Sequence, residues 1–349
     1  MSHNNSLLSG IQQVGIGVTD AEAAFTWYRR NLGMDVPVFK DASTAELMVR
    51  YTGNEARKRY AILAMNMQGG GGFEIWQYTS RVPQPAAFQI QAGDLGIFGI
   101  LMKCRDVKAT HAAYKAKGLA VSDVFPTPDG GSRFHLNDPY GNRFTFTPGL
   151  DWFGTGKHPN GGITGVQIGV SEMGRSLKFY QETLGFNQVV FDQTGPAPEL
   201  GSGHFRRVLL RPNPAFGGAF RRLLGAAEVE LIQSMQHIGR KVFENRFWGD
   251  LGYIHVCFDV NDMDGLEKNC AQKGSPFTVN SRDSFDMGEA AGHFTYTEDP
   301  DGTLIEFVQT HRIPLVKKIG WYLDLKKRGS FKPLPDWMLR TLGWGRVKD

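Results

Sequence analysis

The sequence comprises 349 residues, of which 41% are hydrophobic and 21% charged, values typical of globular proteins that bury a sizeable core. The formal net charge is +4, no apolar run reaches the length of a membrane span, and the first residues lack a signal-peptide pattern, so we expect a cytoplasmic protein with neither membrane nor nucleic acid as partner. The three cysteines, Cys104, Cys257 and Cys270, have no paired spacing, which excludes a disulfide framework and a zinc finger.

The first predicted unit begins with a strand over residues 11–18, in which apolar and polar side chains alternate. A period of two places Gln13 on the face opposite the apolar residues. Asp20 can cap the helix that follows, and Gly33 can end it. The apolar positions at helical spacing are Ala24, Phe25, Tyr28 and Leu32.

The third unit repeats the first along the chain. Tyr28 recurs as Tyr180 and Gly33 as Gly185, both 152 residues later. A strand-like run and a helix-capping residue keep the same spacing before each pair. A register shared over this many positions indicates a duplicated chain.

The second and fourth units correspond in the same way, with residues 99–118 matching residues 255–274 at an offset of 156. Both units end in an Asp-Pro turn, at Asp138 and at Asp299. Each unit therefore reads as a strand, a helix and about three further strands. The last strand of the units is expected at 72–76, 143–146, 229–232 and 304–307.

These units predict four modules in two domains, followed by a tail. The connection 148–162, rich in Gly and Pro, is the expected domain boundary. The first domain, residues 1–150, holds module 1 (11–80) and module 2 (95–149); the second, residues 151–310, holds module 3 (163–236) and module 4 (252–310); the basic aromatic C-terminal tail is residues 311–349.

The sequence also predicts the structure of three segments outside the regular strands and helices of the modules. The connection 235–251, which contains several arginines and aromatic residues, is predicted to form an interfacial helix. Residues 193–227 are expected to hold one strand and to form either a lid over a cup or, as the favoured reading, a surface insertion. The tail has ten Lys and Arg against three Asp, which would suit an acidic partner or a membrane surface. Packing on the acidic body or a second subunit is favoured, because the tryptophans are spaced by Pro and Gly and do not follow one helical face.

Module 4 suggests a metal site. His255 lies in an alternating strand over residues 253–260, and Glu306 lies between Ile305 and Phe307, so both side chains point away from the apolar face. A histidine and a carboxylate aimed into a cupped sheet suit a metal ion. Ordinary solvent-facing strand residues are the alternative. Glu74 and Glu306 favour the first reading, because a carboxylate in an apolar strand is costly unless it is paired or coordinated.

The sequence resembles the vicinal oxygen chelate superfamily, which includes glyoxalases, bleomycin resistance proteins and extradiol dioxygenases. The resemblance rests on residues 13–20 with Phe25, Tyr28 and Leu32-Gly33, on the repeat at 165–185, and on the turn at 299–302 leading to residues 305–307. It covers residues 11–310. It implies an α+β fold of four βαβββ modules that form two cupped, incomplete β-barrels.

The resemblance also implies where metal ligands lie, because each of two partnering modules supplies one from its first strand and one from its last. The first-strand positions are Gln13, Gly99, Gly165 and His255, and the last-strand positions are Glu74, Thr145, Glu230 and Glu306. Pairing modules 1 and 2, or 3 and 4, leaves the ligand set incomplete. Pairing modules 1 and 4 gives Gln13, Glu74, His255 and Glu306, a set similar to that of glyoxalase I; the inner pair would then be a site that has lost its ligands.

This set implies a divalent metal, with Zn, Ni, Co, Mn and Fe all open, and a lyase or isomerase acting on a small molecule with adjacent oxygens. Glu74 and Glu306 are the candidates for the catalytic base. An extradiol-type ring-cleavage dioxygenase is one alternative, although its pattern needs two histidines and one glutamate. A metal-free small-molecule or antibiotic-binding protein is the other, and Gln13 as a plain strand residue stays open. We expect a monomer or a homodimer.

Overall fold

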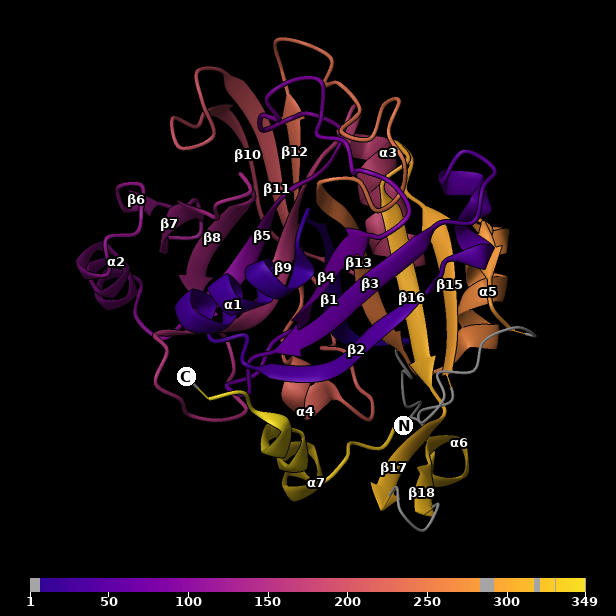
Figure 1. The fold of residues 1–349 in the computed structure, drawn as a ribbon. Coiled ribbons are helices and arrows are strands. Elements are labelled where there is room, and N and C mark those ends of the chain that lie inside the picture. The colour runs from indigo at the N-terminus through magenta and orange to yellow at the C-terminus, as the bar shows by residue number, and fades with distance from the viewer. Residues whose placement is uncertain (1–6, 283–291, 317–320, 330, 349) are drawn as a thin grey trace.

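The computed structural model describes residues 7–282, 292–316, 321–329 and 331–348. Four modules of similar architecture follow one another along the chain, and a short C-terminal segment follows the last (Figure 1). The α+β class and the four-module organisation predicted from the sequence are confirmed.

Modules 1 and 2 each begin with a long strand and continue with a helix. Module 1 consists of β1 (Leu8–Gly17), α1 (Ala21–Leu32), β2 (Val36–Thr44), the 3-10 helix η1 (Glu46–Tyr51), β3 (Lys58–Met65) and β4 (Gly72–Tyr78). Module 2 consists of β5 (Gly96–Cys104), α2 (Val107–Ala116), β6 (Phe125–Pro126), β7 (Ser132–Asn137) and β8 (Arg143–Pro148). Asp20 caps α1 by accepting the Ala23 N–H, as predicted, and Gly33 ends the helix at a φ of 68°.

Modules 3 and 4 repeat this order. Module 3 consists of β9 (Asn160–Gly169), α3 (Met173–Lys178), the single π-helical turn η2 (Phe179–Thr183), β10 (Gln188–Pro196), β11 (His204–Arg211), α4 (Arg221–Leu224) and β12 (Glu228–Ser234). Module 4 consists of β13 (Gly252–Val260), α5 (Met263–Gln272), β14 (Val279–Asn280), β15 (Gly292–Glu298) and β16 (Leu304–Thr310). The tail contains β17 (Arg312–Val316), β18 (Trp321–Asp324), α6 (Leu325–Arg328), α7 (Asp336–Arg340) and η4 (Thr341–Gly345).

The strands form two eight-stranded sheets that do not follow the order of the modules. The outer sheet has the order β14-β15-β16-β13-β1-β4-β3-β2, which joins module 1 to module 4. The inner sheet has the order β10-β11-β12-β9-β5-β8-β7-β6, which joins module 2 to module 3. At the centre of the outer sheet β1 runs antiparallel to β13, with Gly15 opposite His255, and parallel to β4.

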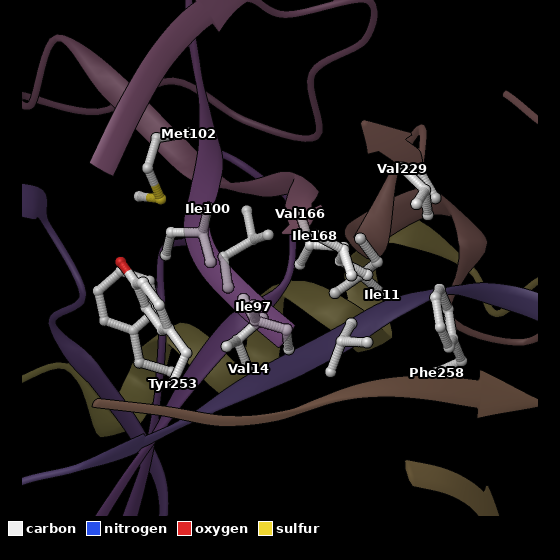
Figure 2. Packing of buried hydrophobic residues seen from close by; sticks show 14 of the residues in the cluster. Ile11, Val14, Ile97, Ile100, Met102, Val166, Ile168, Val229, Tyr253 and Phe258 are labelled. Atoms are coloured by element: carbon white, nitrogen blue, oxygen red, sulfur yellow. The ribbon is translucent and has the colours of Figure 1, made fainter. Parts of the chain in front are cut away.

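The main hydrophobic core lies between the two sheets and under the helices. Apolar side chains from the central strands of both sheets face one another there (Figure 2). They include Ile11 and Val14 of β1, Tyr253 and Phe258 of β13, Ile97 and Ile100 of β5, and Val166 and Ile168 of β9. Because strand side chains alternate, the other face of each sheet is left to form a cup.

Two buried tyrosine–aspartate hydrogen bonds link modules that are neighbours in sequence but lie in different sheets. The Tyr28 hydroxyl of module 1 donates to Asp138 of module 2 over 2.6 Å. The Tyr180 hydroxyl of module 3 donates to Asp299 of module 4 over 3.0 Å. Repeated tyrosines and repeated Asp-Pro turns therefore meet in pairs, and each pair fastens a helix of one sheet to a strand turn of the other.

The prediction of an interfacial helix at residues 235–251 is wrong. The segment consists of turns and one isolated bridge, Leu95 with Lys241. Aspartate side chains hold it, because Asp94 accepts the backbone N–H of Arg240 and Asp250 accepts that of Phe247. These local acceptors satisfy backbone donors without a helical ladder.

The tail packs against the body. Residues 193–227 contain the end of β10, all of β11 and α4, and so hold more than the one strand that was predicted. Leu325, Leu334 and Leu339 of the tail share a cluster with Val36, Met65, Met67, Phe153, Ala219, Leu223 and Leu224. Among the described residues, no helix combines the length and apolar character that crossing a bilayer requires.

Replacing Tyr180 by Phe tests the link between modules 3 and 4. The substitution removes the donor to the buried Asp299 carboxyl, and we expect the free energy of unfolding in urea to fall by about 1–3 kcal/mol. Tyr60→Phe is the matched control, since its hydroxyl bonds to Glu22 at the exposed surface, and it should change stability by less than about 0.5 kcal/mol. Equal stabilities of the two variants would contradict the assigned role of Tyr180.

Candidate metal centre

Three potential metal ligands meet at the centre of the outer sheet. Glu74 comes from β4, His255 from β13 and Glu306 from β16, and one ligand atom of each lies within 4.8 Å of the others. The alternation of each strand puts them there: the neighbours of Glu306, Ile305 and Phe307, are fully buried in the main core, so Glu306 faces the cup. Among the described residues, no other group of His, Cys, Asp and Glu has this geometry.

The separations suit ligands of one ion. His255 Nε2 lies 3.0 Å from Glu306 Oε2 and 3.3 Å from Glu74 Oε2. Adjacent ligands about 2.1 Å from a common ion are about 3 Å apart, so these atoms need little movement to share one. His255 is fully buried, whereas the side chains of Glu74 and Glu306 keep 12% and 10% of their surface exposed.

Gln13 lies beside the same group. Its Nε2 donates to Glu306 Oε2 over 3.4 Å. Its Oε1 is buried and has no hydrogen-bond partner among the described residues. A buried amide oxygen without a donor is costly, and a neutral oxygen in this position can complete a ligand set. The structure therefore brings together all four residues that the sequence selected for the outer site.

The site is strongly acidic apart from the imidazole. Burial lowers the pKa of His255, but the carboxylates of Glu306 and Glu74 outweigh it and raise the pKa to about 10. Burial likewise raises the pKa of Glu74, and the adjacent His255 outweighs that effect and lowers it. A proton on His255 thus supplies the positive charge that two buried carboxylates require. A divalent cation can replace that proton, because metal ligation requires neutral imidazole.

Gly15 makes room for the His255 ring. A Cβ atom at position 15 would lie 2.5 Å from His255 Cε1 and 2.8 Å from Nδ1. Any side chain there would displace the imidazole. Sequence reasoning did not select Gly15, although its place directly opposite His255 follows once β1 and β13 are paired.

The inner sheet contains an ion-pair network at the corresponding place. Glu230 is fully buried, with Oε2 2.7 Å from Arg133 Nη1 and Oε1 2.7 Å from Arg207 Nη2. Gln167 donates to Glu230 over 3.0 Å, and Arg207 also pairs with Glu199. Burial raises the pKa of Glu230, but the two guanidinium groups outweigh it and lower the pKa to about 2.

The other inner positions carry no charged ligand. Gly99 and Gly165 have no side chain, and the Thr145 hydroxyl donates to Gln167 Oε1 over 2.9 Å. The inner cup therefore satisfies Glu230 with arginine. Sequence reasoning did not select Arg133, Arg207 or Gln167. Of the three, Gln167 could have been noticed, because it occupies the position in module 3 that Gly15 occupies in module 1, 152 residues earlier.

The comparisons with known proteins agree with the fold. The model of the Glyoxalase/Bleomycin resistance protein/Dioxygenase superfamily matches residues 10–146 and 162–307. Glyoxalase I from Zea mays superposes with a TM-score of 0.54 at 14% identity, covering 86% of this chain and 92% of that chain. A putative dioxygenase from Bacillus subtilis superposes with a TM-score of 0.57 at 13% identity, covering 98% of both chains. At such identities the structures show a shared fold, and no curated protein sequence matches the chain significantly.

Replacing Glu230 by Gln tests the role of the inner network. The variant leaves two buried guanidinium groups without their shared carboxylate, and we expect the free energy of unfolding to fall by about 3–5 kcal/mol. Asp336→Asn breaks an exposed pair with Arg222 and should cost less than about 1 kcal/mol. Guanidinium chloride denaturation of both variants measures the difference. A Glu230→Gln variant as stable as Asp336→Asn would show that the network does not stabilise the inner cup.

Proposed function

The chain belongs to the Glyoxalase/Bleomycin resistance protein/Dioxygenase superfamily, and we propose that it is a metal-dependent lyase or isomerase acting on a small molecule with two adjacent oxygens. The observation that supports this most is the convergence of Glu74, His255 and Glu306 from three strands of the outer sheet. One divalent ion would be held in the outer cup and none in the inner cup.

The donor set suits such an ion. Two carboxylates balance the charge of a divalent cation, the imidazole of His255 supplies a nitrogen donor, and the buried Oε1 of Gln13 supplies a neutral oxygen. Four protein ligands leave two adjacent positions on an ion that accepts six. The set contains no thiolate, which argues against soft ions such as Cu(I).

A bound divalent ion would act as a Lewis acid on two adjacent substrate oxygens and thereby acidify a neighbouring C–H bond. The chain itself must move the proton. Glu74 and Glu306 are both partly exposed, and in the proposed reaction one of these carboxylates would take the proton from one carbon and return it to the next. In an isomerisation this leaves the carboxylate unchanged at the end of the cycle.

The donor set also bears on the alternatives. A ring-cleaving dioxygenase of this superfamily is expected to use two histidines and one glutamate, and His255 is the one histidine in the cluster found among the described residues. A metal-free binding protein would leave Glu74, Glu306 and His255 as a buried charged group without a function. Lyase or isomerase chemistry makes use of all three.

Metal loading tests the proposal. We expect one equivalent of Ni, Co, Zn or Mn per chain after reconstitution and desalting, measured by inductively coupled plasma mass spectrometry. His255→Ala should bind at least about tenfold more weakly, since it removes the nitrogen donor. Asp192→Asn, which changes an exposed carboxylate remote from the cup, is the control. Iron with oxygen uptake would instead support the dioxygenase, and the absence of any stoichiometric metal would support the binding protein.

Proton exchange identifies the base. We expect the metal-loaded protein to exchange the C–H hydrogen of small 2-hydroxy carbonyl compounds for deuterium in D₂O, followed by proton NMR. Of Glu74→Gln and Glu306→Gln, the variant that alters the base should lose about 100-fold or more of the exchange rate. Metal content is measured on the same samples, so that loss of the ion and loss of the base are separated. Full exchange by both metal-loaded variants would show that neither Glu74 nor Glu306 is the base.

A further inference from the structure

The imidazole of His255 lacks the contact that usually orients a metal-binding histidine. Such histidines normally donate the second ring N–H to a carboxylate, a backbone carbonyl or water, which fixes the plane of the ring. Nδ1 of His255 is buried and has no hydrogen-bond partner among the described residues. It lies instead over Gly15. Packing must therefore fix this ring.

Two aromatic side chains supply that packing. The Trp248 ring is nearly parallel to the His255 ring, with an interplanar angle of 12° and centroids 6.3 Å apart. Tyr296 meets the imidazole edge-on, at 90° and 5.5 Å. The His255 ring is therefore packed beside Trp248, Tyr296 and the backbone of Gly15.

Trp248 is itself fixed by module 1, although it belongs to the connection between modules 3 and 4. Its backbone N–H donates to the Tyr51 carbonyl over 2.9 Å, and its backbone carbonyl accepts from the Tyr78 hydroxyl. Its ring packs edge-on against Trp76, with centroids 4.7 Å apart. Only 7% of the Trp248 surface is exposed.

An ion pair two residues later holds the turn that carries Trp248. Asp250 is fully buried, pairs with Arg81, and accepts the backbone N–H groups of Gln84 and Phe247. The inner half has an equivalent pair 156 residues earlier, in which Asp94 pairs with Arg240. Asp94 also accepts two backbone N–H groups, those of Gln91 and Arg240. The two turns are therefore held by equivalent contacts, an aspartate–arginine ion pair and two backbone N–H groups bound to the aspartate.

The duplication provides an internal comparison. The offset of 156 residues that relates Asp250 to Asp94 relates His255 to Gly99 and Trp248 to Ala92. The outer cup thus has both the ring and its indole neighbour, and the inner cup has neither. If Trp248 served only to fill the turn, a comparable side chain would be expected at Ala92, since the two turns are otherwise alike.

We propose that Trp248 is a positioning residue of the outer metal centre, which holds the plane of the His255 imidazole so that Nε2 stays within about 3 Å of Glu74 and Glu306. The inference rests on the proposed function, since it assigns Trp248 a role toward the same ion. In this role Trp248 acts through its contact with the His255 ring.

Paired substitutions of Trp248 test this role with Co(II) as the probe, titrated into the full chain. Trp248→Leu removes the flat ring, and we expect the Co(II) dissociation constant to rise about 10–100-fold, with a changed visible absorption spectrum. Trp248→Phe keeps a flat ring and should rescue both the affinity and the spectrum to near the unsubstituted values. Circular dichroism of the metal-free variants verifies that each is folded.

The Co(II) titrations distinguish the positioning role of Trp248 from the metal site itself. A Trp248→Leu variant with unchanged affinity and spectrum would overturn the positioning role and leave the metal site intact. Failure of the unsubstituted chain to bind Co(II) would overturn the proposed function and this role together. Equal losses in Trp248→Leu and Trp248→Phe would assign Trp248 to general packing and overturn the proposal.

A second pair of variants covers the case in which Trp248→Leu does not fold. Arg81→Ala releases Asp250 and loosens the turn carrying Trp248, so we expect a rise in the Co(II) dissociation constant of about tenfold. Arg240→Ala breaks the matching pair with Asp94 beside the inner cup and should leave Co(II) binding unchanged. Equal binding by the two variants would overturn the proposal.

Discussion

The antiparallel pairing of β1 with β13 is the contact on which the site depends. It joins the first and last modules and sets Gly15 opposite His255. On either side, β4 and β16 run parallel to these strands and bring in Glu74 and Glu306. A slip of one residue would turn His255 into the hydrophobic core and the core residues into the cup. The buried apolar side chains of β1 and β13 oppose that slip, so the same packing that stabilises the fold determines the geometry of the site.

In both cups a buried glutamate needs a positive charge beside it. The inner cup supplies that charge internally, since Arg133 and Arg207 hold Glu230 ionised at a pKa of about 2. The outer cup has two carboxylates and one imidazole; burial lowers the pKa of His255, but Glu306 and Glu74 outweigh it and raise that pKa to about 10. A guanidinium is a permanent part of the chain, whereas a proton on histidine can be exchanged for an external ion. This difference makes the outer cup the one suited to metal binding.

Much of the fold and of the outer site could be predicted from the sequence, because strand alternation is a local pattern and the two repeats keep a fixed spacing. Strand alternation selected His255 and Glu306, and the resemblance to a known superfamily added Gln13, Glu74 and the pairing of modules 1 and 4. The arginines of the inner cup could not be found this way, since Arg133 and Arg207 lie on middle strands that carry no motif. The connection 235–251 was predicted as a helix from its composition; the structure instead pins it through Asp94 and Asp250, whose partners are remote in sequence.

The arrangement of the modules explains how the two halves can differ. Each cup takes its strands from two modules that belong to different halves of the duplicated chain. A substitution in one module therefore alters one cup only, while the Tyr28–Asp138 and Tyr180–Asp299 bonds still fasten the two sheets together. Under this constraint, a histidine and the tryptophan beside it can be present in one cup and absent from the other without loss of the shared core. The inner cup then contributes stability through its buried ion pairs, and the outer cup is free to keep a buried charged group whose burial is costly.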